Sequence, residues 1–181
     1  MFNNELWQKP AGGAGGNFYT YQIANSFRWD SGYLKRTPGS AGNRQTWTFS
    51  CWIKQSGTIT NSPGDVAINN NVEHVLGIYG GYETATRFKG YMAEVVFIDG
   101  TALDPTSFAS EKNGVWIPDD VSGLTFGSQG YYLNFADASA PGNDVSGNNN
   151  DWTNVSLSTH DQMLDTPTFN SDSNGGNFAT Y

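Results

Sequence analysis

An oxygen-rich block near residue 150 has the residue types and the spacing best suited to ligand chemistry. Asp144, Ser146, Asn148 and Asn150 carry side-chain oxygens at every second position. Calcium loops use oxygen ligands at such regular spacing, so calcium is a candidate ligand of these four residues. The bidentate Glu that closes an EF-hand loop is missing, and Asx turns around Gly147 would explain the same residues without an ion. Both interpretations stay open, and no other cofactor is indicated.

The carboxylates do not form the pair that glycoside hydrolysis needs. A glycosidase uses two carboxyl groups that flank one glycosidic bond, and no two of the five Glu residues are close in sequence. Glu94 stands out because its neighbours between Tyr91 and Ile98 are all apolar. It could be a general acid with a raised pKa, or a structural carboxylate that accepts hydrogen bonds from Arg or backbone groups. Because no second carboxylate is nearby in sequence, we favour the structural role.

The other candidate bases and nucleophiles do not form a catalytic set either. His74 and His160 are the only histidines, and the chain has no Gly-x-Ser-x-Gly elbow. The single cysteine, Cys51, lies in register with an apolar strand face, which is typical of a core residue rather than a reactive thiol. A single cysteine also excludes an internal disulfide. The sequence therefore predicts a protein that is not an enzyme.

Aromatic residues, 14% of the chain, are the third group with ligand-binding chemistry. Aromatic rings pack against the apolar faces of pyranose rings, so exposed ones could bind glycans. Trp52 interrupts the polar face of a strand, so it is either an incidental exposed residue or the mark of a contact surface. We select Trp52, Tyr82 and Trp116 as the predicted glycan-binding residues, with Tyr79 and Tyr131 as further candidates. Core packing is the alternative role for most of these rings.

Charge and hydropathy exclude two classes of partner. Lys and Arg number 9 against 17 Asp and Glu, which gives a net charge of -8. Nucleic-acid binding depends on neutralising phosphates with basic residues, so we expect no nucleic-acid partner. The sequence has no apolar run of membrane-spanning length, and its first residues lack the basic start and apolar core of a signal peptide. We therefore expect a protein that is not inserted in a membrane.

The apolar run from Tyr91 to Ile98 predicts the central strand of the fold, because both of its faces carry side chains that must be covered. Asp99-Gly100 predicts a turn after this strand. Asp104 followed by Pro105 is typical of a helix start, and we expect one short helix over residues 105–109.

Short strands account for most of the remaining pattern. Trp47, Phe49, Cys51 and Ile53 alternate with polar residues and predict one inward strand face. Further strands are expected at residues 27–29, 74–79, 115–117, 131–135 and 152–157. About seven short strands separated by Gly-, Asn- and Ser-rich turns favour an all-β fold, an antiparallel β-sandwich of the jelly-roll type. Along 131–135, the inward residues are expected to be Tyr131, Leu133 and Phe135.

The expected organisation is an arm, one sandwich and a tail. Residues 1–22 form a flexible arm, 23–160 the β-sandwich domain and 161–181 an extended C-terminal tail. Because a Gly-rich segment has few side chains to pack, the arm is free to reach a neighbouring subunit. The residues expected to serve this assembly arm are Leu6, Trp7, Gly12, Gly13, Gly15 and Gly16.

Four blocks together resemble the concanavalin A-like lectin/glucanase superfamily, which includes laminin-G domains, and more narrowly its branch in bacteriophage tail-fibre and other virion proteins. The blocks are residues 26–30, 46–54, 88–103 and 144–152. The resemblance implies a jelly-roll sandwich. The Asp-x-Ser-Gly-Asn block and the strand near residue 133 come last here, whereas they come first in the commoner order, which implies a circularly permuted sandwich. The usual Trp-His block and Tyr-x-Asn-Gly hairpin are missing between residues 54 and 71, which implies a truncated sandwich or a missing part of the chain.

The resemblance also implies a function. It favours a non-enzymatic bacteriophage structural protein of the virion, in a tail fibre, a tail tip or a capsid decoration. The expected partners are copies of the same chain, with a homo-oligomeric trimer favoured, and other virion proteins. A neighbouring subunit would cover the face left open by the missing hairpin. The alternative is a carbohydrate-binding lectin module that recognises host-surface polysaccharide for host adhesion, and a glycoside hydrolase is the least supported function.

Overall fold

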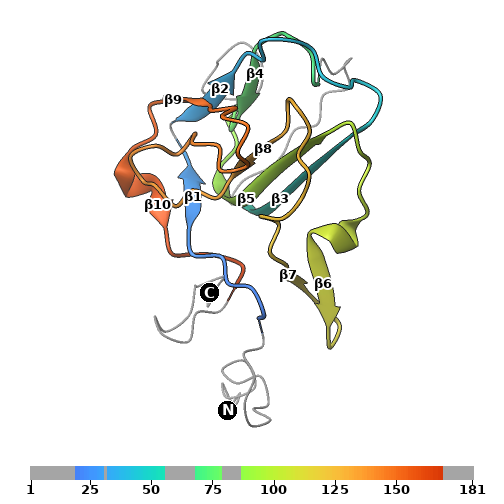
Figure 1. Ribbon diagram of the computed structural model, residues 1–181. Helices are drawn as coiled ribbons and strands as arrows, with labels where there is room; N and C mark the ends of the chain where they lie inside the picture. The colour runs from blue at the N-terminus through green and yellow to red at the C-terminus, as the bar shows by residue number, and fades with distance from the viewer. Residues whose placement is uncertain (1–18, 31, 56–67, 79–86, 169–181) are drawn as a thin grey trace, which may run out of the picture.

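The computed structural model describes residues 19–30, 32–55, 68–78 and 87–168, and in this part the protein is an all-β antiparallel sandwich (Figure 1). The predicted fold class is confirmed at this level. The secondary structure consists of two strands of nine and ten residues, further strands of two to four residues, and single turns of 3-10 helix. The many turn-forming residues between apolar runs explain why the strands are short.

The larger sheet is built around β5, the strand predicted to be central. One edge of β5 pairs along its length with β3, while the other edge pairs first with β1 and then with β8. Strand β10 extends this sheet beyond β1. The strands are β1 (Ser26–Trp29), β3 (Trp47–Gln55), β5 (Gly90–Asp99), β8 (Tyr131–Leu133) and β10 (Gln162–Met163).

The second sheet has three strands in the order β4-β2-β9, and a separate hairpin joins β6 to β7. Figure 1 shows this hairpin projecting away from the two sheets. The strands are β2 (Tyr33–Arg36), β4 (His74–Leu76), β6 (Ala109–Lys112), β7 (Val115–Pro118) and β9 (Thr153–Val155). Two 3-10 helices, η3 (Pro105–Ser107) and η4 (Thr159–Asp161), complete the described elements.

The main core lies between the two sheets. Its buried side chains come from β1, β2, β5 and β8 and from the segments that follow β8 and β9. They include Tyr131, Leu133 and Phe135, so the predicted inward alternation is confirmed. The buried members are Phe27, Trp29, Leu34, Val95, Phe97, Tyr131, Leu133, Phe135, Trp152 and Leu157.

A second core covers the opposite face of β5. Val96 and Ile98 point to this side, because successive side chains of a strand point to opposite faces. They pack against Tyr132 of β8 and against side chains from the β5–β8 connection, Phe108, Val121 and Phe126. Both faces of β5 are therefore covered within one chain, as its continuous apolar run predicts.

A bulge in β5 places Glu94. Ser50 pairs with Val96, but Trp52 pairs with Ala93, so two residues of β5 lie opposite Cys51. Glu94 is one of them, and its φ of 51° lies in the left-handed region. An extra residue with this conformation is typical of a β-bulge, which redirects a side chain. The bulge lies where the other edge of β5 passes from β1 to β8.

The predicted short helix is confirmed at its start as the single turn η3, but it ends at Ser107 rather than at the expected residue 109, because Ala109 begins β6. The Asp104 carboxylate accepts a hydrogen bond from the Thr106 backbone N–H at 3.0 Å, as an N-cap residue does. Pro105 occupies the first helical position, where a missing N–H costs no hydrogen bond.

The predicted inward face of β3 is wrong for two of its four residues. Phe49 is 43% exposed and Ile53 is 50% exposed, whereas Trp47 and Cys51 pack partly against the main core. The reason is the position of β3 at the end of the described sheet, since the fully buried residues of the main core come from the other strands. Strand alternation identifies the apolar face but not how far the opposite sheet extends over it.

The sandwich continues past residue 160. Strand β10 pairs with β1, and the buried Thr168 hydroxyl accepts a hydrogen bond from the Ile23 backbone N–H at 3.0 Å. Strand β4 ends at Leu76, three residues before the expected end, and β6 was not predicted. Residues 1–18 of the predicted arm lie outside the described residues.

Candidate functional sites

The Asp144 loop is a closed hydrogen-bond network. The Asp144 carboxylate accepts hydrogen bonds from the backbone N–H groups of Tyr132, Ser146 and Asn150, at 2.8 to 2.9 Å. Its second oxygen also accepts from the Ser146 hydroxyl at 2.9 Å. Asp151 accepts from the Asp144 N–H at 2.8 Å. Hydrogen-bond donors therefore already occupy the Asp144 carboxylate, which would be the first ligand of a calcium site.

The two Asn residues of the block also use their amides within the protein. Asn148 Nδ2 donates to the carbonyl oxygens of Gly127 and Gly130, and Asn150 Nδ2 donates to those of Ser128 and Gly130. These bonds fix the turn before β8. Among the described residues, no group of three or more His, Cys, Asp and Glu is placed to hold a metal ion. The structure thus places the four predicted calcium ligands in an Asx-turn network, and calcium binding stays a prediction.

Two of the three predicted glycan-binding residues lie in one cleft. Trp52 of β3 and Trp116 of β7 line a cleft of about 300 Å³ between β3 and the β6–β7 hairpin. Phe108 and Leu103 contribute apolar walls, and Thr48 adds a hydroxyl. Trp116 is 49% exposed, so its ring is accessible. The sequence selected these two residues, but only the fold brings them together.

The other aromatic candidates divide into buried and undescribed positions. Tyr131 is a core residue, stacked on Phe97 with 5.6 Å between ring centroids. Tyr79 and Tyr82 lie outside the described residues, as do the arm residues Leu6 and Trp7 with the glycines that follow them.

Glu94 is a buried carboxylate held by two tyrosines. It accepts a hydrogen bond from the Tyr132 hydroxyl and a longer one, 3.4 Å, from the Tyr21 hydroxyl. Burial raises the pKa of Glu94 to about 7; the two hydroxyls oppose this rise and the charge of Asp120 adds to it. Asp120 is a carboxylate close enough to act on Glu94 in the fold, but it lies too far away in the sequence for a local pattern to reveal it. Glu94 lines neither the cleft at Trp116 nor the cavity between the sheets that is described below. The structural role therefore stays favoured.

Cys51 behaves as the sequence predicts. It packs against the main core, and burial raises the pKa of its thiol to about 11. A thiol that stays protonated at neutral pH is a poor nucleophile. The structure gives no reason to assign it a reactive role.

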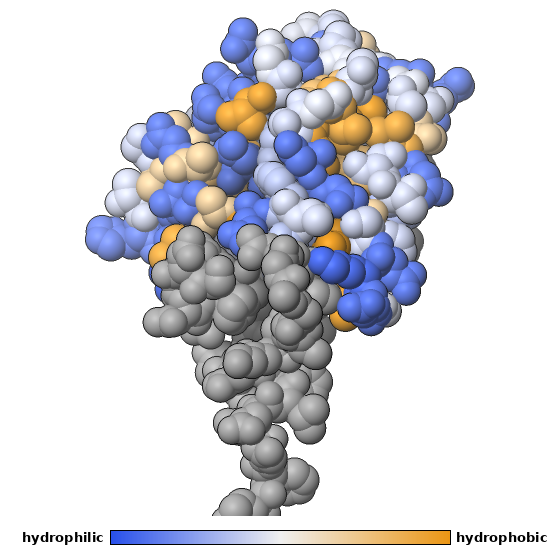
Figure 2. Space-filling model, turned by 60° about the horizontal axis from the view of Figure 1, so that its bottom comes forward, coloured by the Kyte–Doolittle hydropathy of each residue, from blue (hydrophilic) through white to orange (hydrophobic). Residues whose placement is uncertain are grey.

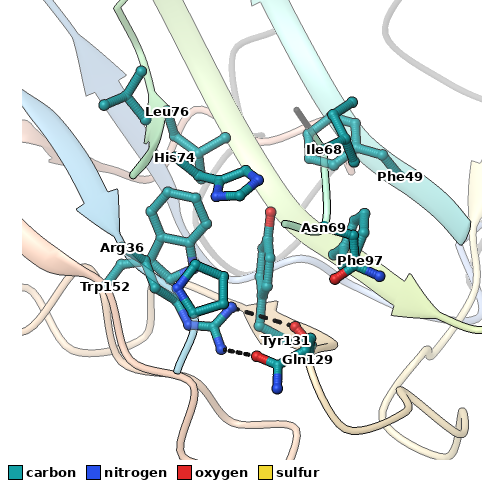
Figure 3. Close-up of a pocket in the computed structure, with 12 residues that line it drawn as sticks. Arg36, Phe49, Ile68, Asn69, His74, Leu76, Phe97, Gln129, Tyr131 and Trp152 are labelled. Carbon is teal, nitrogen blue, oxygen red and sulfur yellow. Dashed lines mark hydrogen bonds between the residues drawn. The ribbon is translucent and has the colours of Figure 1, made fainter. Parts of the chain in front are cut away.

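A second cavity lies between the sheets, and sequence reasoning missed it. Its volume is about 240 Å³, and its lining comes from β2, β3, β4, β5, β8 and the residues around them (Figure 3). The polar residues in the lining are Arg36, Asn69, His74 and Gln129. They are spread over nearly a hundred positions of sequence, so no local motif marks them.

The fold and these sites define an antiparallel β-sandwich with an aromatic cleft at one edge and a cavity between its sheets. No protein-family model matches the chain, and neither a curated protein nor a solved structure matches it. Within the described ranges, no helix has the length and apolar character needed to cross a membrane.

Proposed function

We propose that the chain is a non-enzymatic structural protein of a bacteriophage virion, assembled through contacts between copies of itself. The single observation that carries the proposal is the exposed apolar face of β3. Phe49 and Ile53 lie on this strand, at the end of the described sheet. Figure 2 shows that apolar residues reach the surface next to polar ones on the face it presents. A second copy covering such a face would bury apolar area and pair a strand edge.

The resemblance to virion jelly rolls supports the same proposal and names its setting. A tail fibre, a tail tip or a capsid decoration consists of repeated copies, and a trimer is the assembly that we favour. The predicted arm would reach a neighbouring subunit or another virion protein through the residues before Tyr19, because Tyr21 already bonds to Glu94 and Tyr132 of its own chain. In this proposal, the protein belongs to the virion.

The mass of the purified full chain in solution tests self-assembly. We expect light scattering after size exclusion to give about three times the 19.7 kDa of one chain. The double substitution of Phe49→Ser and Ile53→Ser should shift the mass to that of one chain. Val145→Ser is the matched control, because Val145 is an exposed apolar residue beside β8, which pairs with the edge of β5 opposite to β3. A single-chain mass for the unchanged protein would contradict the proposal.

A glycan-binding lectin module is the second candidate, and the aromatic cleft favours it. Trp52 and Trp116 line one cleft, and an accessible indole can stack on the apolar face of a pyranose ring. The two proposals are compatible, because an oligomer of a virion protein can also bind host-surface polysaccharide.

Binding of the full chain to a glycan array tests this second candidate. We expect Trp116→Ala to weaken any binding at least tenfold, since stacking on an aromatic ring is lost. Val115→Ala is the matched control, because Val115 lies on the same strand and is 47% exposed but does not line the cleft. Equal losses in the two variants, or no binding by the unchanged chain, would exclude the lectin function.

A further inference from the structure

The cavity between the sheets has room for one aromatic ring and a substituent. Its volume is about 240 Å³. An apolar cavity of about 150 Å³ binds benzene, so the space beyond one ring fits a small polar group. Phe49 belongs to the wall and is 43% exposed, so the cavity lies next to the surface on the side of β3. The other apolar walls include the rings of Phe97, Tyr131 and Trp152 and the aliphatic side chains of Ile68 and Leu76.

The hydroxyl of Tyr131 is a polar group of this wall without a hydrogen-bond partner. Tyr131 is only 6% exposed, and its side chain forms no hydrogen bond to the described residues. The unpartnered atoms that packing closes off include ring nitrogens of His74 and Trp152 but not the Tyr131 oxygen. Figure 3 shows this hydroxyl pointing into the space between His74 and Ile68. A small molecule in the cavity can therefore reach it.

The position of this hydroxyl is fixed before any ligand binds. The Tyr131 ring stacks on Phe97, with 5.6 Å between the ring centroids and 16° between the planes. Trp152 meets the Tyr131 ring edge to face at 5.1 Å. Tyr131 also lies opposite Phe97 in the pairing of β8 with β5. Because the ring is already held, binding to its hydroxyl costs little ordering of the protein.

The lining offers no charge that lacks a counter-charge. Arg36 is its one Asp, Glu, Lys or Arg side chain, and its guanidinium donates to the side chains of Gln129 and Asn150. Burial lowers the pKa of Arg36, whereas Tyr131 and the charge of Asp144 oppose this fall. Since Asp144 already acts on the cation, a charged ligand would lose its water without gaining a free partner. The cavity therefore favours a neutral ligand.

Water alone is a poor occupant of this space. A buried water typically makes about three hydrogen bonds. The side-chain N–H groups of Asn69 and Gln129 already donate to other residues, so they are not free to hold a cluster of waters. A water on the Tyr131 hydroxyl would also leave the apolar walls uncovered, whereas an aromatic ring covers them.

We propose that this cavity binds a small neutral molecule of the phenol class, with one aromatic ring and one polar group. The ring packs against the aromatic and aliphatic walls. The polar group forms a hydrogen bond with the Tyr131 hydroxyl, which can donate or accept. The site is separate from the Trp116 cleft and goes beyond the proposed assembly function.

Methyl nuclear magnetic resonance of the full chain, labelled with ¹³C at isoleucine, tests the proposal. Ile68 lines the cavity, and Ile68→Val identifies its signal. The probes are phenol, benzene, which lacks the polar group, and sodium benzoate, which carries a charge. We expect phenol to shift the Ile68 signal saturably and to bind about fivefold more tightly than benzene, because it adds one hydrogen bond. Benzoate should bind at least about tenfold more weakly than phenol, because its charge loses water.

A pair of variants isolates the Tyr131 hydroxyl. Tyr131→Phe keeps the ring, so phenol should now bind no more tightly than benzene, while benzene binding should change by less than about twofold. Tyr91→Phe is the matched control, because Tyr91 lies on β5 but does not line the cavity. It should leave both affinities unchanged. Should Tyr131→Phe fail to fold, the comparison of the three probes on the unchanged chain still decides the proposal.

Several results would overturn the proposal. They are the absence of a saturable shift with phenol, equal affinities for phenol and benzene in the unchanged chain, and benzoate binding as tight as that of phenol. Equal effects of Tyr131→Phe and Tyr91→Phe would exclude the hydrogen bond to Tyr131. A single-chain mass or a silent glycan array would leave these measurements unaffected, so failure of this proposal and failure of the proposed function are distinguishable.

Discussion

The Asp144 loop and the cavity beside it are neighbours with opposite hydrogen-bond character. In the loop, the Asp144 carboxylate accepts four hydrogen bonds. Beside the cavity, the buried Nε1 of Trp152 and Nε2 of His74 have no hydrogen-bond partner among the described residues. The two regions meet where Arg36 donates to Asn150. A cluster of oxygen side chains is therefore no sign of a ligand site when its atoms already bond to one another.

Glu94 stands between these extremes. It is as buried as Asp144, with 6% of each residue exposed, but its hydrogen bonds come from two tyrosine hydroxyls rather than from backbone N–H groups. The two buried carboxylates thus depend on different donors, since backbone N–H groups are held in place by the fold whereas tyrosine hydroxyls can rotate. Four measurements examine this comparison.

Asp144→Ala should have the largest effect. Three backbone N–H groups and one hydroxyl lose their acceptor, and we expect the free energy of unfolding to fall by about 4 kcal/mol. Urea denaturation measures this change. Asp137→Ala is the matched control, because exposed Asp137 accepts mainly from Ser139 and water can replace it. If the two variants lose equal stability, the Asp144 network does not stabilise the fold.

Glu94→Gln should change how stability depends on pH. Burial raises the pKa of Glu94 from 4.5 to about 7, so between these values the folded protein binds more protons than the unfolded chain. The free energy of unfolding of the unchanged protein therefore falls as pH rises through this window and levels off above it.

The variant lacks this contribution, so relative to the unchanged protein it should gain about 3 kcal/mol between pH 4.5 and pH 8. Urea denaturation at several pH values measures the gain. Glu111→Gln, at an exposed position of β6, should leave the pH dependence unchanged. Parallel stability curves for Glu94→Gln and the unchanged protein would mean that Glu94 titrates at its ordinary pKa.

Arg36→Gln should have a smaller effect on stability, because it removes hydrogen bonds to neutral groups that join the loop to the cavity. We expect a loss of about 1 to 2 kcal/mol in urea denaturation. Lys35→Gln, which removes an exposed ion pair, should cost less than about 0.5 kcal/mol. A larger loss for Lys35→Gln than for Arg36→Gln would contradict the structural link between the two regions.

Calcium should have the smallest effect. Because the Asp144 oxygens already accept hydrogen bonds, we expect the thermal midpoint to be the same in millimolar calcium and in a chelator. Differential scanning calorimetry measures the midpoint. A midpoint that rises with calcium concentration would show that the loop opens to bind the ion, as the spacing of its oxygen side chains allows.

Local patterns were sufficient to predict much of the framework. The apolar run around β5 predicted a strand with both faces covered, and both cores confirm it. Asp104-Pro105 predicted the start of η3, and the alternation of Tyr131, Leu133 and Phe135 predicted their burial. These features follow from the order of residues within one short segment, which a local pattern describes directly.

The sites depend on pairings that no local pattern contains. The exposure of Phe49 follows from the place of β3 at the end of the described sheet, and the position of Glu94 from a bulge between β3 and β5. The sequence indicated Trp52 and Trp116 separately, but only packing of the hairpin near β3 puts them in one cleft.

By itself, then, the sequence determined the all-β class, the central strand and the composition of the Asp144 loop. The tertiary structure decided which polar atoms are satisfied. Arg36, His74 and Trp152 lie far apart in the chain, and they meet because β2 pairs with both β4 and β9. A cavity is the space that packing leaves unfilled, so it is a property of the whole arrangement of strands rather than of any segment.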